Sequence, residues 1–533
     1  MPTNSSSVVG TKVSTAPLFG FPLIQWIWSS WINGATVAIA LAGAAGFTLS
    51  KAMPRGPVDA AQTLTMMAVC LATGILAGLA LPNRWGVLLA LLSHMAAFEL
   101  GRMGAVGPTV DLPRLDSTYG ILAFVLGRGF HALVGLLPLV YGASLGGRIG
   151  KYLMPAASLS NSRLLLAASS GSFASWAFTV LIGIALIVLA VWVALPASTP
   201  PILGEDGKPL PGSIAELTKL SLGGQEQAIM IRGHSVDNPV LLYLSGGPGQ
   251  TDLPYTRVLL QDLEKDFIVV GWDQRGSGKS YSALDPASTL TLDQAISDTI
   301  ELADYLRVRF DEQKIFLLGE SWGSTLGVLA VQREPDCFYA FIGSGQMVSQ
   351  RETDRRLYQD VLDLAAQTDD EALAQKMHAY GEPPYADMLA YPFVMGQYDR
   401  LYKPHTPPQA YIDRGTAANL GFWGINGSEY SLVEKVNVLR AALDMFSVMY
   451  PQIQGVDFRK DVPSLEVPVY ILDGAAELTS RRDLALEWYS QLQAPIKRIY
   501  TFQNSAHSTA FEQFEAFHQI MLETVLPETY PER

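Results

Sequence analysis

Charged residues and cysteine are both scarce in this chain of 533 residues. Charged side chains make up 16% of the sequence, whereas ordinary globular chains carry about 25%. Hydrophobic residues make up 49%, and a single hydrophobic core rarely serves more than about 250 to 300 residues. These values argue against one compact soluble domain and favour at least two regions of different kinds.

The scarcity of cysteine and of basic clusters excludes several classes of site. Cys70 and Cys337 are too few for a disulfide framework, and neither lies in a Cys-x-x-Cys or Cys/His grouping typical of zinc. Residues 1–200 hold 10 Lys and Arg against 4 Asp and Glu, and the remainder holds 27 against 46. Neither part has a dense Lys/Arg cluster, so we expect no nucleic acid partner. We also expect no metal and no cofactor.

Long uncharged runs dominate the first 200 residues. Phe173–Leu195 has 23 consecutive residues without a charge, enough for a helix to cross a hydrocarbon core of about 30 Å. A soluble helical bundle would need polar stripes that these runs lack. We therefore predict an all-α transmembrane region over residues 1–196 with about five spans. The other four are expected at 35–50, 60–81, 85–100 and 119–147.

The orientation of this region is predicted from the basic residues next to its last span. Arg148, Lys151 and Arg163 precede that span, with no acidic residue between 148 and 172. The positive-inside rule places this loop in the cytoplasm. The expected location is therefore a multi-pass cell membrane protein, with the lipid bilayer as partner and the C-terminal domain extracytoplasmic. Lys51 and Arg55 point to a different count of crossings, so the number of spans stays open.

Residues 197–212 are rich in proline and glycine and form a predicted linker. Beyond it, short apolar runs alternate with helical patterns, a pattern typical of strands buried on both faces of a mostly parallel sheet. The six runs are 239–244, 267–272, 314–319, 338–343, 467–472 and 496–502. We predict an α/β domain over residues 213–533 with helices on both faces. A helical, aromatic-rich insertion at about 350–460 is expected to form a cap.

A candidate nucleophile follows the third of these runs. Ser321 is the centre of a G-x-S-x-G motif between a predicted strand and a predicted helix, where a sharp turn lifts the hydroxyl off the sheet edge. A serine needs a base, normally histidine. Of five histidines in the domain, His507 alone lies in a loop between the last predicted strand and the C-terminal helix. We predict Ser321 as nucleophile and His507 as base.

Two carboxylates are candidates for orienting the imidazole. Asp473 stands at the end of the strand predicted at 467–472, and Glu477 lies in the loop beyond it. The longer side chain of Glu477, placed in that loop, favours it for contact with the histidine. Asp473 would more often end the strand or cap the turn, but it remains the alternative acid.

A glycine-rich turn after the first run supplies candidate oxyanion donors. Gly246 and Gly247 lie where a backbone N–H can approach a substrate carbonyl, and the N–H of Trp322 is the second expected donor. The later RGSGKS sequence ends like a phosphate-binding loop, but that motif requires glycine where Asp273 stands. Nucleotide binding is therefore not expected.

The motifs LSGGPG, GWDQRGSGKS, GESWGS, GSGQMV and NSAHS occur in that order. Together, over roughly residues 213–530, the chain resembles the proline iminopeptidase (prolyl aminopeptidase) family of α/β-hydrolases. The resemblance implies an α/β-hydrolase fold, Ser321 as nucleophile, His507 as base, and Gly247 and Trp322 as oxyanion donors. Ser245 stands where that family usually has His, and Glu477 where it usually has Asp.

The function expected from the sequence is a membrane-anchored serine hydrolase that acts through an acyl-enzyme. An aminopeptidase of proline iminopeptidase type is the first choice, acting on a small peptide. The first alternative is an esterase or lipase-like hydrolase of a membrane-associated ester. The second is a non-catalytic membrane sensor or binding protein. The oligomeric state is not predicted.

Overall fold

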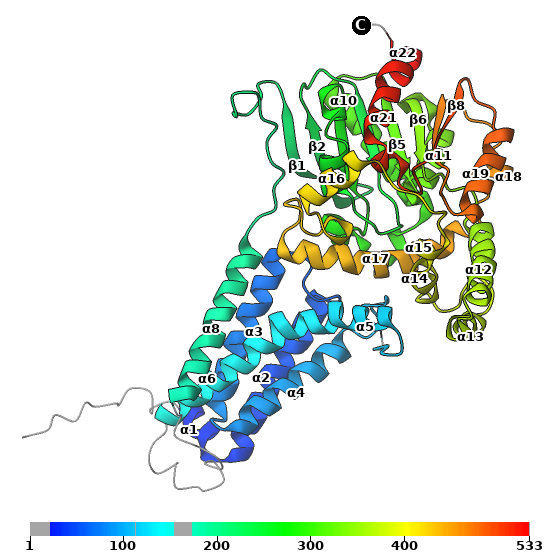
Figure 1. Ribbon diagram of the computed structural model, residues 1–533. Helices are drawn as coiled ribbons and strands as arrows, with labels where there is room; N and C mark the ends of the chain where they lie inside the picture. Colours follow the sequence, from blue (N-terminus) through cyan, green and yellow to red (C-terminus); the bar gives the residue numbers. More distant parts are fainter. Residues whose placement is uncertain (1–21, 112, 154–172, 532–533) are drawn as a thin grey trace, which may run out of the picture. The chain divides into compact units, whose positions relative to one another are not determined.

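The computed structural model describes residues 22–111, 113–153 and 173–531 (Figure 1). The chain forms two compact units. Within the described residues the first unit comprises 22–57, 61–104, 131–153 and 173–191, and the second comprises 58–60, 105–130 and 192–531. The helices of the N-terminal region are α1 (Pro22–Ser29), α2 (Trp31–Ala52), α3 (Ala60–Ala80), α4 (Arg84–Gly101), α5 (Thr118–Phe124), α6 (Leu137–Leu153) and α8 (Phe173–Ala194).

Four helices in the described part of the chain are long and apolar enough to cross a membrane: Trp31–Ala52, Ala60–Ala80, Thr118–Leu153 and Ser175–Ala194. The sequence predicts about five spans, and four helices of the described residues meet this measure of length and hydropathy. The segment predicted at 85–100 does form a helix, α4, but Arg84, His94 and Glu99 lower its hydropathy. The segment predicted at 119–147 lies inside one helix of 36 residues. Arg163, used to predict orientation, lies outside the described residues.

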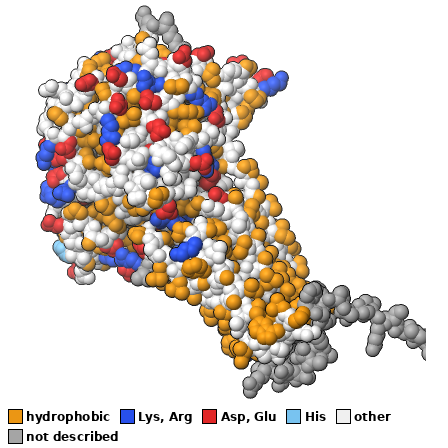
Figure 2. All heavy atoms as spheres, turned by 180° about the vertical axis from the view of Figure 1, so that it is seen from behind, with side chains coloured by type: hydrophobic (Ala, Val, Ile, Leu, Met, Phe, Trp, Pro, Cys, Tyr) orange, Lys and Arg blue, Asp and Glu red, His pale blue; other side chains and the backbone are white. Residues whose placement is uncertain are grey.

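The first unit is packed through small residues. A Cβ at Gly74 of α3 would collide with the carbonyl of Leu139 in α6, and one at Gly142 would collide with the carbonyl of Leu71. Such close approach of helices is typical of packing in bilayers. Large apolar side chains along α8 are exposed, among them Val188 and Ile187. Hydrophobic side chains cover the helices of this unit, and charged ones gather over the second unit (Figure 2).

The second unit contains an eight-stranded sheet in the order β1-β2-β4-β3-β5-β6-β7-β8. β1 and β2 pair antiparallel, β2 pairs antiparallel with β4, and all remaining pairs are parallel. The strands are β1 (Ile214–Leu222), β2 (Gln225–Gly233), β3 (Val240–Leu244), β4 (Ile268–Asp273), β5 (Ile315–Glu320), β6 (Phe338–Ser344), β7 (Val469–Gly474) and β8 (Lys497–Phe502). The six predicted runs all form strands, which confirms the mostly parallel α/β fold.

Helices cover both faces of this sheet and bury its alternate side chains. On one face, Leu242 and Ile471 pack with residues of α10 (Leu292–Phe310), α11 (Trp322–Arg333) and α19 (Thr479–Gln491). On the other face, Leu241 and Tyr470 pack with residues of α9 (Leu253–Leu259) and α21 (Phe514–Ile520). β3 lies between β4 and β5, so the chain reverses its direction of strand addition there. Ligands of open α/β sheets bind at the carboxyl ends of strands beside such a reversal.

A helical insertion separates β6 from β7. It consists of α12 (Gln350–Gln367), α13 (Glu371–Tyr380), α14 (Ala390–Met395), α15 (Tyr398–Leu401), α16 (Gln409–Ala418), α17 (Leu432–Ile453) and α18 (Phe458–Asp461). α17 begins with a capping box, in which Ser431 and Glu434 bond to each other's backbone N–H groups. In Figure 1 this helix runs along one end of the sheet. The glycines that it touches, Gly249 and Gly276, follow the carboxyl ends of β3 and β4.

Residues 105–130, hereafter segment 105–130, belong to the second unit although the sequence placed them within the membrane region of 1–196. The reason is polar pairing: the backbone N–H of Thr109 donates to Asp444 at 3.0 Å, and Arg440 donates to the carbonyl of Leu126 at 3.1 Å. The predicted linker is also bonded to the second unit, since the N–H of Ser198 donates to the carbonyl of Ser428 at 2.9 Å.

Candidate active site

Ser321 lies at the sharp turn between β5 and α11. Its backbone has φ 52° and ψ −118°, a conformation that non-glycine residues rarely adopt. The flanking glycines make the turn possible, because a Cβ at Gly319 would collide with the backbone of Gly323, and one at Gly323 with that of Leu244. The N–H of Ser321 donates to the carbonyl of Ser344 at 3.0 Å. The turn therefore presents the serine at the carboxyl edge of the sheet, as the G-x-S-x-G motif requires.

His507 and Glu477 are in direct contact. Nδ1 of His507 hydrogen-bonds Oε2 of Glu477, and the other carboxylate oxygen accepts from the N–H of Leu478 at 2.7 Å. Burial opposes ionisation of Glu477, but the nearby His507 and Arg481 outweigh it and hold the pKa of this carboxyl below its ordinary value. The carboxylate can thus accept the Nδ1 proton, which leaves Nε2 as the basic nitrogen.

The other candidate acid has different partners. Oδ2 of Asp473 accepts hydrogen bonds from Arg482 at 2.7 Å and from the Thr501 hydroxyl at 2.8 Å. Asp473 is the second-last residue of β7, and Glu477 lies three residues beyond the strand. The geometry therefore brings Glu477, and not Asp473, to the imidazole.

The loop of His507 and the turn of Ser321 are joined on two sides. The hydroxyl of Ser508 donates to Oε1 of Glu320 at 2.7 Å. Gly345, which follows the partner of the Ser321 N–H, lies so near His507 that a Cβ there would be 2.9 Å from Nδ1. Gly345 also has φ +54°, a conformation that favours glycine. These contacts bring the serine and histidine loops to the same edge of the sheet.

The turn Ser245–Gly249, hereafter the oxyanion turn, lies against the same serine. A Cβ on Gly246 would be 3.3 Å from the Cβ of Ser321, and Gly247 has φ +120°. The backbone N–H of Trp322 belongs to the residue that opens α11. The turn and the helix start thus lie on either side of Ser321, where an oxyanion would form if this serine attacked a carbonyl.

Gln274 joins the two sides of this candidate oxyanion hole. Its amide Nε2 donates to the carbonyl of Ser245 at 3.2 Å, and its Oε1 accepts from the indole Nε1 of Trp322 at 2.8 Å. Ser245 directly precedes the candidate donor Gly246, and Trp322 is itself a candidate donor. Gln274 lies inside the sequence GWDQRGSGKS, which alone indicates no role for it. Only the folded chain shows that it bridges two separate strand ends.

Two further charged residues beside the site were not predicted. Arg481 is buried, with Nη1 3.7 Å from Glu477 and its guanidinium 4.5 Å from the centre of the Tyr398 ring. In the sequence, only its position four residues after Glu477 indicates that Arg481 could lie near this acid. Glu320 is also buried, and burial together with the neighbouring Asp252 raises its pKa to about 8. Glu320 therefore holds its proton at neutral pH.

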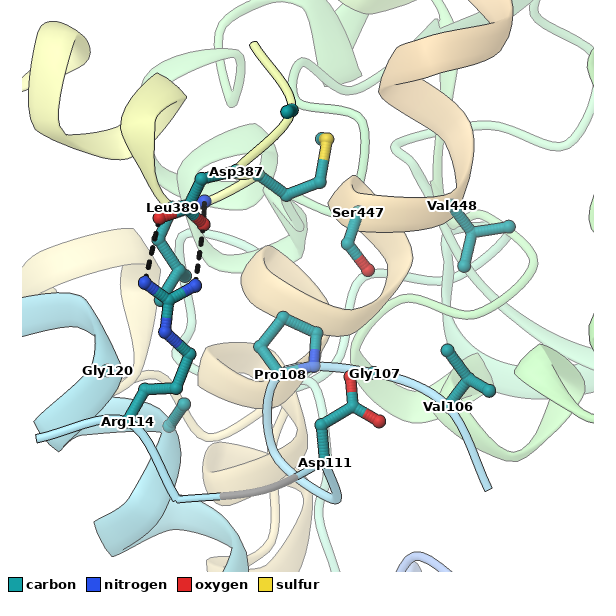
Figure 3. Close-up of a pocket in the computed structure, with 13 residues that line it drawn as sticks. Val106, Gly107, Pro108, Asp111, Arg114, Gly120, Asp387, Leu389, Ser447 and Val448 are labelled. Atoms are coloured by element: carbon teal, nitrogen blue, oxygen red, sulfur yellow. Dashed lines mark hydrogen bonds and ion pairs between the residues drawn. The ribbon is translucent and has the colours of Figure 1, made fainter. Parts of the chain in front are cut away.

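No group of three or more His, Cys, Asp and Glu side chains in the described part of the chain is arranged to hold a metal ion. A cavity of about 580 Å³ lies between segment 105–130 and the cap (Figure 3). Arg114 makes a two-pronged ion pair with Asp387 at its rim, with both contacts at 2.8 Å. Ser321, Glu477 and His507 are not among the residues that line it.

The sheet order, the strained serine turn and the two loops beside it define an α/β hydrolase. A family model described as the alpha/beta hydrolase fold matches residues 239–512, and the chain belongs to this family. The protein is thus an enzyme of the hydrolase type.

Named relatives include peptidases. A probable aminopeptidase, YbaC of Bacillus subtilis, is 32% identical over 308 residues, which cover 57% of this chain and 94% of the relative. The proline iminopeptidase of Lactobacillus delbrueckii subsp. lactis is 26% identical over 309 residues, covering 57% of this chain and 95% of that protein. Among solved structures, a proline iminopeptidase-related protein from Thermus thermophilus has 22% identity and a TM-score of 0.42, covering 60% of this chain and 99% of the other.

Proposed function

We propose that the protein is a membrane-anchored serine hydrolase that cleaves N-terminal residues from small peptides through an acyl-enzyme. The observation that carries this proposal is the contact between His507 and Glu477 at the edge of the sheet where Ser321 stands. Relatives named as aminopeptidases support the peptide substrate.

In the proposed mechanism Ser321 attacks the substrate carbonyl while Nε2 of His507 takes the hydroxyl proton. Glu477 holds the imidazole by Nδ1 and stabilises its positive charge. The N–H groups of the oxyanion turn and of Trp322 stabilise the negative oxygen of the tetrahedral intermediate. The same histidine then protonates the leaving amine, and water releases the acyl group by the reverse sequence.

The nucleophile is tested by covalent labelling. A fluorophosphonate reacts with activated serines, so it should label the wild-type protein and fail to label Ser321→Ala. Ser447→Ala, a serine replacement in the cap helix α17, is the matched control and should be labelled normally. Labelling that persists in Ser321→Ala would exclude this serine as nucleophile.

Peptide and ester hydrolysis are separated by a substrate panel. An aminopeptidase should hydrolyse proline arylamide with a free amine and lose most turnover when that amine is acetylated. Ester hydrolysis is the second candidate, because Ser245 replaces the histidine usual in the resembling family. Fast turnover of aryl esters without turnover of any arylamide would favour the ester.

Membrane anchoring is supported by the four long apolar helices. We propose that the catalytic unit is extracytoplasmic, since Arg148 and Lys151 precede the last span. A protease-cleavable tag at the C-terminus should then be removed by protease added to intact cells or spheroplasts. Removal only after lysis would place the catalytic unit in the cytoplasm.

A further inference from the structure

Helix α17 has a buried polar face that binds the N-terminal part of the chain. Asn437, Arg440 and Asp444 are spaced by three and four residues, so they share one side of the helix. Asn437 donates to the carbonyl of Val58 at 2.6 Å, and Arg440 donates to the carbonyl of Leu126. The three side chains are buried. A helix of the cap is therefore tied to residues more than 300 positions earlier in the sequence.

Asp444 is the centre of this polar face. Its Oδ1 accepts from the backbone N–H of Thr109 at 3.0 Å, and its Oδ2 accepts from the Thr109 hydroxyl and from the Tyr281 hydroxyl, the latter at 2.7 Å. All three residues are buried. A buried carboxylate depends strongly on such donors, because water does not replace them. Thr109 and Asp444 thus hold α17 at one place on segment 105–130.

The side of α17 next to this polar face rests on the turns beside Ser321. The carbonyl oxygen of Ala441 would be 2.5 Å from a Cβ at Gly249, the last residue of the oxyanion turn. The side chain of Met445 would be 3.1 Å from a Cβ at Gly276, which follows Gln274 by two residues. Packing this close leaves no free space, so a shift of α17 moves the oxyanion turn with it.

We propose that segment 105–130 positions the oxyanion turn through α17, with Thr109 and Asp444 as positioning residues. This inference rests on the proposed hydrolase function. Oxyanion donors act only when held close to their productive geometry, and a misplacement of about 1 Å costs up to about a hundredfold in rate. The N-terminal region then contributes to catalysis itself, in addition to any role in the bilayer.

The test compares two replacements of Thr109 in the full chain. Thr109→Val keeps the shape and the backbone N–H but removes the hydroxyl that binds Asp444, whereas Thr109→Ser retains a hydroxyl. We expect kcat to fall about tenfold in the Val variant with KM within about twofold, and to stay near wild type in the Ser variant. Fluorophosphonate labelling run to completion counts the competent sites, so kcat per labelled site is unaffected by unfolded protein.

Arg114→Ala is the matched control. It removes a polar contact of the same segment, but one with Asp387 at the cavity rim and not with α17 (Figure 3), so kcat should stay at the wild-type value. Equal kcat in Thr109→Val and Thr109→Ser, or an equal loss in Arg114→Ala, overturns the positioning role. Absence of labelling in the wild type instead overturns the proposed hydrolase function, so the two failures are distinguishable.

Discussion

Glu477 is a buried carboxylate with two positive or potentially positive neighbours, His507 and Arg481. Its lowered pKa keeps it ionised, so it can balance the charge that the imidazole gains during proton transfer. The carboxylate of Asp473 instead forms an ion pair with Arg482. The two acids therefore differ in function because of their partners, although only three residues separate them.

This difference predicts unequal effects of two matched amide replacements. Glu477→Gln keeps the shape but loses the charge that stabilises the imidazolium, so kcat should fall about a thousandfold. Asp473→Asn should leave kcat within about threefold and cost about 1 kcal/mol of stability through the weakened Arg482 pair. Steady-state kinetics and thermal unfolding of both variants check this, and the opposite ranking would make Asp473 the acid.

Glu320 predicts a pH dependence of its own. The carboxyl faces Asp252, Glu512 and Tyr243, and burial is the largest cause of its raised pKa of about 8. It is neutral below that pH and ionised above it. An added negative charge beside Ser321 disfavours the oxyanion, so kcat/KM should fall as pH rises through about 8.

Replacement of Glu320 by Gln keeps a neutral side chain at every pH. The alkaline fall in kcat/KM near pH 8 should therefore disappear in Glu320→Gln. Measurement of kcat/KM between pH 6 and 10 in both proteins checks this. An unchanged alkaline limb in the variant would assign that fall to another group.

For single residues, the sequence predicts those that lie in a recognisable short motif. Ser321 and His507 are recognised because each lies in a short motif between a strand and a helix. Gln274 lies in a quoted motif and Arg481 follows Glu477 by four residues, but neither position reveals a role, because the role depends on side chains brought together from separate strand ends. The order of preference between Glu477 and Asp473 followed from side-chain length and loop position, which agrees with the contact that the fold makes.

Among the secondary-structure elements, β6 is followed by a turn at Gly345 that packs against the loop of His507. Gly345 has a positive φ, and the ring of His507 occupies the space that a Cβ would need. Gly345→Ala should therefore displace the imidazole and lower kcat at least about tenfold, with a stability loss of about 1–2 kcal/mol from the left-handed backbone. Kinetics together with thermal unfolding measure the two effects separately.

Gly415→Ala is the control for that prediction. Gly415 lies within helix α16, and a Cβ there would meet nothing within 4 Å. Alanine favours helix more than glycine does, so this variant should be neutral or slightly stabilised. Equal activity of the two alanine variants would mean that the β6 turn does not hold His507 in place.

The predictability of the strands follows from their burial. β3, β4, β5 and β7 are buried along their whole length, so each is a continuous apolar run that the sequence reveals within one or two residues. β1 and β2 were not predicted. β1 is an edge strand with mixed exposure, and its Glu216, Lys219 and Ser221 interrupt any apolar run.

For the whole molecule, the second unit is discontinuous in sequence. Composition predicts a boundary near residue 200, because apolar content and charge change there. Composition does not reveal that segment 105–130 belongs with the catalytic unit, since its pairing depends on Thr109, Leu126 and their partners in α17. Buried polar contacts between segments far apart in the chain produce no recognisable sequence pattern in either segment, so they are not predicted from the sequence.

This organisation predicts the behaviour of a truncated chain that begins at residue 197. This truncation removes Val58 and segment 105–130, which uncovers Asn437, Arg440 and Asp444 on α17. We expect α17 to open locally, so limited proteolysis should cut within 432–453 in the truncated chain and spare that helix in the full chain. Equal protection and equal fluorophosphonate labelling of the two chains would show that the catalytic unit folds without this segment.

The same discontinuity matters while the chain is being made. About 300 residues separate segment 105–130 from α17, and ribosomes add roughly 5–20 residues per second. Thr109 and the Leu126 carbonyl therefore emerge about 15–60 s before the helix that binds them exists. During that interval the segment needs another environment for its polar groups, and the catalytic unit is not completed until α17 has been synthesised.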